Sequence, residues 1–195
     1  MNERGLKGLE SRMRLLEAAA AEFARNGFHE TKISTIVKKV GLTQPSFYIY
    51  FSSKEAIFEE LISEFHSNLK KLIESKRLED NLEHMDLSNR LAEIVENVFL
   101  FLKKDPNLTR IGFSLNPKAD DLIADLTIIL KNNLTTEQQF GYFRPEIDME
   151  IVAKCISAVI LHLSFIYVIP GIKDTKSLSL QLVDLFLQGM LNEND

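Results

Sequence analysis

The sequence predicts an all-helical protein, and three observations support this prediction. Glycine and proline are scarce, with 8 and 5 among 195 residues, so long stretches lack residues that break helices. Apolar residues recur three and four positions apart in most segments, which is the period of an amphipathic helix. The chain is 45% hydrophobic and 26% charged, a composition typical of a soluble globular protein with a real core.

The first helix is expected over residues 11–26. Leu16 and Phe23 share its apolar face with two alanines between them. Gly27 follows as a C-terminal stop, because glycine tolerates the backbone conformation that ends helices. Phe28 is then positioned to pack back on the last turn.

A second and a third short helix follow. Thr31 is the expected N-cap of the second helix, and Gly41 ends it. Thr43 is the expected N-cap of the third helix. Pro45 fits in its first turn, where its missing N–H has no helical partner. The cap bond of Thr43 must therefore reach the N–H of Ser46.

Ser52 and Glu55 have the spacing of a capping box, which predicts the start of a long fourth helix. A polar connection at 76–84 separates it from a helical body. We therefore divide the chain into a head, 1–55, and a body, 56–195. Body helices are expected at 87–103, 109–114, 120–132, 148–169 and 175–192.

The charge is distributed unevenly along the chain. The formal net charge of −5 argues against a nucleic-acid partner. Residues 1–54, however, carry nine basic and five acidic residues, a net charge of +4. A basic head on an acidic body indicates an anionic partner for the head, although short segments also show such an imbalance by chance.

Residues 33–51 have the pattern of a helix-turn-helix, whose second helix enters the major groove of DNA. Gln44 at its tip can hydrogen-bond a base edge, and Pro45 offers apolar surface to a thymine methyl group. Tyr48, Tyr50 and Thr43 can donate to phosphates. The alternative interpretation is a small helical bundle with a tight turn.

Residues 14–61 resemble the N-terminal domain of the tetracycline repressor (TetR) family. The matching features include Gly27-Phe28, the Gly41-Leu42-Thr43 turn, Tyr48, Phe51 and Ser53-Lys54-Glu55-Ala56. The resemblance implies an all-helical homodimer with a C-terminal ligand-binding domain. Such a dimer represses transcription from a palindromic operator and is released by a small molecule. By position, the DNA-binding candidates are Thr31, Thr43, Gln44, Pro45, Ser46, Tyr48, Tyr50 and Lys54.

Three positions depart from the common pattern of that family. Val37 and Val40 stand where alanine is frequent, and both keep the core apolar. Pro45 stands where many members have a small residue, which leaves its own contact open. The C-terminal part of the family varies so much that the resemblance transfers no ligand residues.

The last two expected helices are apolar nearly all round, so we expect them to be buried nearly all round. A body of this size cannot easily bury both, whereas a second subunit can, through a four-helix interface with twofold symmetry. Which of their apolar stripes faces the partner is left open. The candidate interface residues are Val152, Ile156, Val159, Leu163, Leu180, Val183 and Leu187.

A cavity for an apolar effector of unknown identity is expected among the body helices. The candidate lining residues are Phe101, Ile111, Phe113, Leu126, His162 and Phe165. His162 alternatively forms hydrogen bonds within the core. Cys155, the single cysteine, is interpreted as a small apolar core residue.

Enzymatic function is not expected, because the motifs for nucleophilic, phosphate-binding or zinc chemistry are missing. We expect neither a cofactor nor a metal. The start of the chain lacks an apolar signal-peptide core, and the apolar run at 155–169 is shorter than the roughly 20 residues of a membrane span. A cytoplasmic DNA-binding regulator without membrane contact is therefore predicted. The alternative is a helical protein-interaction module with a basic head.

Overall fold

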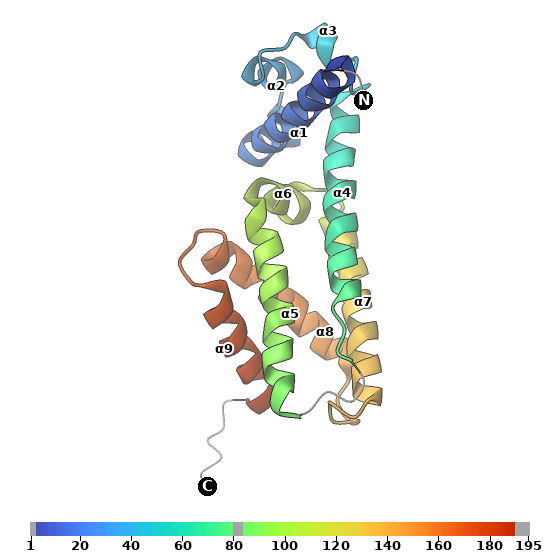
Figure 1. Cartoon of the computed structure of the whole chain (residues 1–195), viewed down its shortest axis with the longest axis vertical. Helices are drawn as coiled ribbons and strands as arrows, with labels where there is room; N and C mark the ends of the chain where they lie inside the picture. Colours follow the sequence, from blue (N-terminus) through green and yellow to red (C-terminus); the bar gives the residue numbers. More distant parts are fainter. Residues whose placement is uncertain (1–2, 80–83, 190–195) are drawn as a thin grey trace. The chain divides into compact units, whose positions relative to one another are not determined.

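The computed structural model describes residues 3–79 and 84–189, and these ranges contain only helices and connecting segments (Figure 1). The first helices are α1 (Glu3–Glu30), α2 (Ile33–Lys39), α3 (Gln44–Phe47) and α4 (Lys54–Ser75). The later ones are α5 (His84–Lys104), α6 (Pro106–Arg110), α7 (Ala119–Gln139), α8 (Met149–Leu163) and α9 (Thr175–Gln188). Two π-helical segments, η1 (Ile111–Leu115) and η2 (Ser164–Val168), continue α6 and α8. The predicted all-α class is confirmed.

The chain forms two compact units. The head unit contains the residues up to Asn68 together with Asn107–Leu122, and the body unit contains Leu69–Pro106 and the residues from Ile123 on. This division differs from the predicted boundary after residue 55. The head extends along α4, and it includes a segment that lies between two body helices in the sequence.

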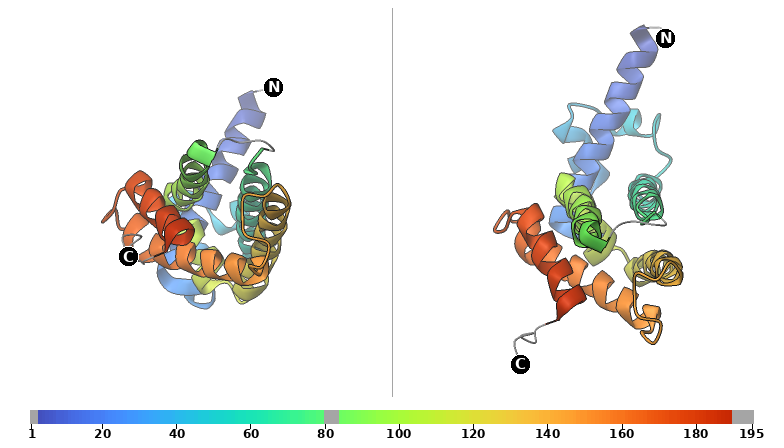
Figure 2. Two further views of the ribbon diagram at one scale, coloured as in Figure 1. Left: turned by 90° about the horizontal axis from the view of Figure 1, so that it is seen from below. Right: turned by 60° about the horizontal axis from the view of Figure 1, so that its bottom comes forward.

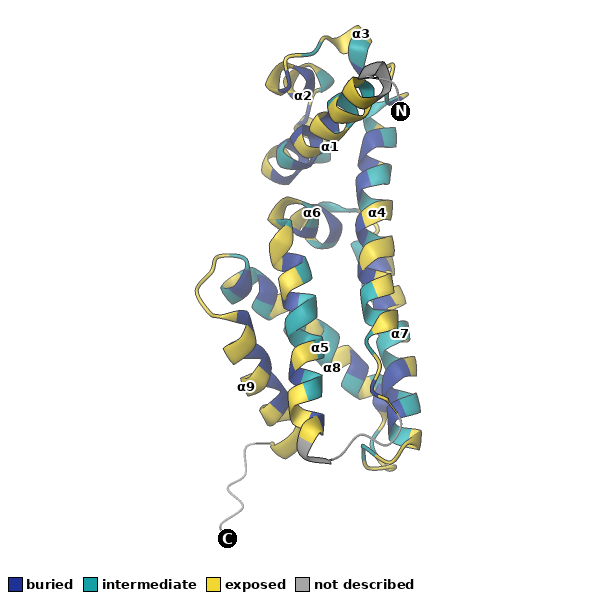
Figure 3. Cartoon of the chain, in the orientation of Figure 1, coloured by how far each residue is buried: buried dark blue, intermediate teal, exposed yellow. Residues whose placement is uncertain are grey.

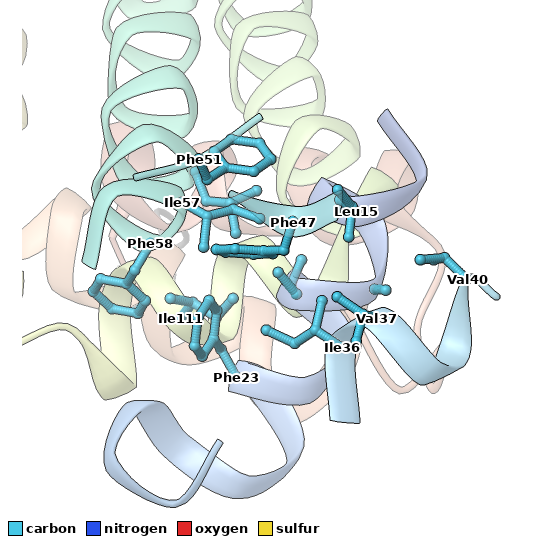
Figure 4. Close-up of a cluster of buried hydrophobic side chains, with 14 of the residues drawn as sticks. Leu15, Phe23, Ile36, Val37, Val40, Phe47, Phe51, Ile57, Phe58 and Ile111 are labelled. Atoms are coloured by element: carbon cyan, nitrogen blue, oxygen red, sulfur yellow. The ribbon is translucent and has the colours of Figure 1, made fainter. Parts of the chain in front are cut away.

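Aromatic residues from several helices fill the head core (Figure 4). Phe23 of α1 and Phe47 of α3 have no exposed surface. The ring of Phe23 contacts that of Phe58 edge to face, with centroids 5.2 Å apart. Ile111 of η1 belongs to the same cluster and is also fully buried. Edge-to-face aromatic pairs add to the stabilisation that burial gives.

The α1 helix begins earlier than predicted and breaks at the predicted position. It starts at Glu3, and Gly27 has a φ of 78°, which interrupts the helical backbone. A residue with a Cβ would be strained there. Phe28 packs back on the core as predicted, with its ring 5.7 Å from that of Phe23.

In the body unit α5 and α9 lie side by side, as both Figure 1 and Figure 2 show. Phe99 of α5, Val168 of η2 and Leu182 of α9 form one buried cluster. Leu134 of α7 and Met149 of α8 belong to a second cluster. At the start of α8 the carboxylate of Asp148 accepts a hydrogen bond from the N–H of Glu150, which caps the helix.

Two buried polar residues of α7 hold the segment that follows α4. Asn133 accepts a hydrogen bond from Arg77 (2.8 Å) and donates one to the carbonyl of Ile73 (3.0 Å). Glu137 accepts a hydrogen bond from the N–H of Leu78 (3.0 Å). Burial raises the pKa of the Glu137 carboxyl, because desolvation outweighs this bond and the nearby Arg77 charge.

The helix Met149–Val168, formed by α8 and η2, has 20 residues and by length and composition could cross a membrane. It is longer than the apolar run identified in the sequence, because the helix extends to Met149 through Glu150 and Lys154. Only 17% of its most apolar stretch is buried within the chain. One face packs on the body clusters, and the other is exposed (Figure 3).

Candidate DNA-binding site

A tight turn links α2 and α3 and fixes their relative direction. The N–H of Leu42 donates to the carbonyl of Val37 (2.9 Å), and Gly41 has a φ of 71°. The guanidinium of Arg14 donates to the carbonyl of Val40 (2.9 Å) and so ties α1 to this turn. The arrangement is the helix-turn-helix predicted from the sequence.

The start of α3 is built as the sequence predicts. The hydroxyl oxygen of Thr43 accepts the N–H of Ser46 (3.4 Å), and Pro45 lies in the first turn. Phe47 anchors the other side of the helix in the core, with no exposed surface. Thr43, Gln44 and Pro45 are therefore exposed at the tip, where a recognition helix contacts bases.

The remaining candidates of this stretch differ in accessibility. Tyr48 is 57% exposed, whereas Ser46 and Tyr50 are half-buried. Tyr50 packs partly against the head core, so its contact surface is its outer edge. Ile49 is 77% exposed and was not among the predicted residues. Helical spacing could not identify it, because α3 ends at Phe47 and Ile49 lies in the following turn.

Thr31 is wrongly predicted both as an N-cap and as a DNA contact. Its side chain is buried, and its hydroxyl contacts the carbonyls of Glu22 (3.2 Å) and Gly27 (2.7 Å). The N-cap position of α2 is Lys32, whose side chain makes no cap bond. Thr31 therefore closes the broken end of α1.

Lys54 has a partner inside the protein instead of a free ammonium group. Its Nζ donates to the carbonyl oxygens of Phe28 (2.8 Å), His29 (3.3 Å) and Thr31 (3.0 Å). The same ammonium lies 4.4 Å from the centroid of the Phe28 ring. A lysine has three N–H donors, and these carbonyls engage all of them. The predicted phosphate contact of Lys54 competes with this arrangement.

We expect Lys54→Met to lower the free energy of unfolding by about 1–3 kcal/mol, because charge-assisted bonds to the end of α1 are lost. Lys38→Met, at an exposed lysine of α2, is the matched control and should leave stability nearly unchanged. Urea unfolding of both variants measures this. If Lys54→Met keeps full stability but lowers the salt dependence of DNA binding by about one counterion per lysine removed, Lys54 contacts phosphate as first predicted.

Several of the basic residues that make the head positive form ion pairs or ring contacts within the protein. Arg12 pairs with Glu60 (2.6 Å) and lies 4.9 Å from the Phe51 ring centroid. Lys39 pairs with the buried carboxylate of Glu22. The net charge of the head therefore overstates the cations available to DNA. Lys7, Arg25, Lys32 and Lys38 are exposed.

The residues of the predicted effector pocket are divided between the two units. Ile111 lies in the head core, and Phe113 contacts Phe65 of α4 with ring centroids 5.6 Å apart, so both belong to the head unit. His162 is exposed on α8, neither in a pocket nor in the core. Phe101 and Phe165 are half-buried, and Leu126 is buried. None of the six lines the body cavity described next.

The body unit contains a cavity of about 150 Å³ among α5, α7, α8 and α9. Every residue that lines it is apolar. Representative residues are Leu91 and Val95 of α5, Leu134 of α7, Val152 and Ile156 of α8, and Val183 of α9. Within the described residues, no three His, Cys, Asp or Glu side chains are grouped to hold a metal ion.

The predicted dimer residues of α8 lie on its inner face. Val152 and Ile156 line the cavity, and Val159 and Leu163 pack against the cluster around Phe99. Val183 of α9 is buried in the protomer, whereas Leu180 and Leu187 are 40% and 37% exposed.

The exposed face of α8 carries the other apolar stripe, which consists of Ile151, Cys155, Ala158 and His162. Cys155 is thus a surface residue and not a core residue.

The fold and the exposed tip of α3 define a DNA-binding regulator of the helix-turn-helix type. Residues 15–61 match the family model of bacterial regulatory proteins of the tetR family. The chain is 55% identical over 185 residues to YdgC of Bacillus subtilis, an HTH-type transcriptional regulator, with 95% of both chains covered. The chain therefore belongs to the TetR family of transcriptional regulators.

Other relatives extend over the whole chain. The fatty acid metabolism regulator protein of Bacillus subtilis is 27% identical, covering 93% of this chain and 96% of that one. The structure of FadR from Bacillus subtilis in complex with stearoyl-CoA is 25% identical, with a TM-score of 0.66, covering 92% of this chain and 99% of that one. The TetR regulator PfmR from Thermus thermophilus has the same fold, with a TM-score of 0.73 over 92% of this chain and 100% of that one, at 22% identity.

Proposed function

We propose that the protein is a homodimeric repressor that binds a palindromic operator through α3 and is released by a small molecule with an apolar group. This proposal rests on one observation, which is that α3 has an exposed tip and a buried inner side. Gln44 and Pro45 are exposed at its tip, while Phe47 on its inner side and Phe51 after it are buried in the head core. The repressor acts in the cytoplasm, where the operator DNA is accessible.

The residues of the tip have distinct tasks in this proposal. The amide of Gln44 can bond an adenine edge through two hydrogen bonds, and Pro45 can contact a thymine methyl group. The hydroxyls of Thr43 and Tyr48 donate to phosphates. The exposed Lys32 and Lys38 supply positive charge to the phosphates in place of Lys54, whose ammonium is bonded within the protein.

We expect Gln44→Ala to relax specificity at one base position in each half-site, at a cost of roughly 1–3 kcal/mol there. Binding titrations on the DNA upstream of the gene and on scrambled DNA, at several salt concentrations, measure this. Lys38→Met is the comparison, because loss of a phosphate contact weakens binding to both DNAs alike. A Gln44→Ala protein that loses equal affinity for both DNAs would show that Gln44 reads no base.

The exposed stripe of α8 supports a twofold dimer. Ile151 is 61% exposed, and Cys155, Ala158 and His162 follow it at helical spacing. Leu180 of α9 adds further exposed apolar surface. An isologous interface presents the same patch on both subunits. Two copies of α3 then face a palindrome with half-sites one helical turn or a multiple of it apart.

The body cavity and one relative support a small-molecule effector. The cavity is lined by apolar side chains alone, and the FadR relative is a complex with stearoyl-CoA. Addition of a matching ligand should therefore lower the affinity for the operator. Fluorescence anisotropy of labelled operator DNA with and without ligand tests this step. Unchanged affinity under saturating ligand would contradict release by an effector.

A further inference from the structure

The residues that line the cavity in the body unit indicate which chemical groups can bind there. Leu91, Leu134, Val152 and Val183 are among its walls, and they come from four different helices. The lining side chains have no N–H or O–H donor, and their one acceptor is the weak thioether sulfur of Met149. A buried polar atom without a partner is costly, and an unpaired buried charge costs far more. The walls therefore favour hydrocarbon and reject charged or strongly polar groups.

The size of the cavity limits this hydrocarbon. Its volume of about 150 Å³ is well below that of most sites for drug-sized ligands. An engineered cavity of similar volume in another protein, lined by the same residue types, stays dry and binds benzene. The cavity therefore matches one compact group, such as a single ring or a short branched chain. It does not match an extended long acyl chain.

The walls are held in place without a ligand. The side-chain amide of Gln138 donates to the carbonyls of Arg144 (2.8 Å) and Ile147 (3.0 Å), which fixes the loop that carries two lining residues. The hydroxyl of Tyr142, next to the lining residue Phe143, donates to the carbonyl of Glu79 (2.6 Å). A preformed site binds with a smaller loss of conformational entropy.

The cavity meets the surface at the last turns of α9. Phe186 and Leu187 both line it, and they are 41% and 37% exposed. In the single protomer, a ligand inserted there can leave its polar part in water. This geometry explains how a site with purely apolar walls can accept a molecule that is otherwise soluble.

We propose that this cavity is a binding site for a compact, uncharged hydrocarbon group, a single ring or a short branched chain, whose polar remainder stays outside. Its role as the effector site rests on the proposed function, whereas binding itself does not depend on DNA. Fluorobenzene is a suitable probe, because fluorine NMR detects its binding directly. 2-Fluoroterephthalate has carboxylates at opposite ends of the same ring, so it cannot insert without burying one of them, and it is the charged comparison.

Fluorobenzene should bind the full-length protein with a shifted or broadened fluorine signal. 2-Fluoroterephthalate should bind at least about tenfold more weakly, because one of its two opposed carboxylates would have to enter the cavity, where no wall residue can pair it. Val152→Phe should fill the cavity and abolish fluorobenzene binding. Ile128→Phe, at an exposed position of α7, is the matched control and should bind normally.

A second variant keeps the proposal testable if Val152→Phe fails to fold. Leu134→Ala enlarges the cavity, so the protein should gain binding of fluoronaphthalene, which the natural protein should bind at least about tenfold more weakly. The proposal is overturned if fluorobenzene does not bind, if Val152→Phe leaves its binding intact, or if 2-fluoroterephthalate binds as tightly as fluorobenzene. It is also overturned if stearoyl-CoA binds and Val152→Phe abolishes that binding while fluorobenzene does not bind.

The DNA step is measured separately, by anisotropy of labelled operator. Fluorobenzene that binds in the cavity and also releases DNA supports both proposals. Fluorobenzene that binds in the cavity without releasing DNA supports the site and contradicts its role as the effector site. The two proposals can therefore fail independently.

Discussion

Ala158→Asp is expected to convert the dimer into monomers. Ala158 lies in the exposed stripe of α8 between Cys155 and His162, so its substitution places a carboxylate in the proposed interface. The twofold axis brings in two copies. Each uncompensated buried charge costs about 3–5 kcal/mol. Monomers reach only one half-site, so operator affinity should fall by about 10²–10⁴-fold.

Light scattering and operator binding measure this effect, and two other substitutions isolate its cause. Ile128→Asp, at an exposed position of α7, should leave the dimer intact. Ile156→Asp places its charge in the cavity wall, so it should destabilise the protomer itself. An unchanged dimer in Ala158→Asp would place the interface elsewhere. Dissociation by Ile156→Asp with full protomer stability would favour the face predicted from the sequence.

The sequence was sufficient for the helix-turn-helix because its rules are local. Thr43 accepts its cap bond from an N–H only three residues away, and Gly41 and Pro45 lie within two residues of Thr43. The identity of the inner residues follows from the same short range, because Phe47 and Phe51 are four positions apart. The family resemblance adds to this local pattern.

The sequence was not sufficient for residues whose contacting residues are distant along the chain. The inner and outer stripes of α8 are both apolar, as neighbouring Ile151 and Val152 illustrate, so hydropathy could not assign their directions. The positions of α5 and α7 decide which stripe is buried. The same limit applies to Lys54, whose carbonyl partners precede it by 23–26 residues.

The assignment of Ile111 to a ligand pocket failed for a related reason. In the sequence Ile111 lies between the body helices α5 and α7, so proximity along the chain suggested the body. The chain returns to the head over Asn107–Leu122. Gly112 shows how close this contact is, because a Cβ there would lie 2.8 Å from the Phe65 ring of α4.

Ile111→Ala is therefore expected to destabilise the DNA-binding head, although the residue is 60 positions after Phe51. Ile111 is fully buried in the cluster of Phe23 and Phe58 (Figure 4). Loss of its side chain leaves a void next to two aromatic rings. Such substitutions cost about 2–5 kcal/mol, which corresponds to a drop of roughly 5–15 °C in the unfolding temperature.

Thermal unfolding and operator binding together distinguish the head core from a ligand pocket. Ile128→Ala, at an exposed position of α7, is the control and should change stability by less than about 0.5 kcal/mol. If Ile111 lined an effector pocket, Ile111→Ala would change ligand affinity and leave the head intact. If it belongs to the head, operator binding should fail at a lower temperature while fluorobenzene binding in the body is retained below that temperature. Normal head stability in Ile111→Ala would contradict the assignment of η1 to the head, because a void in a packed core cannot be neutral.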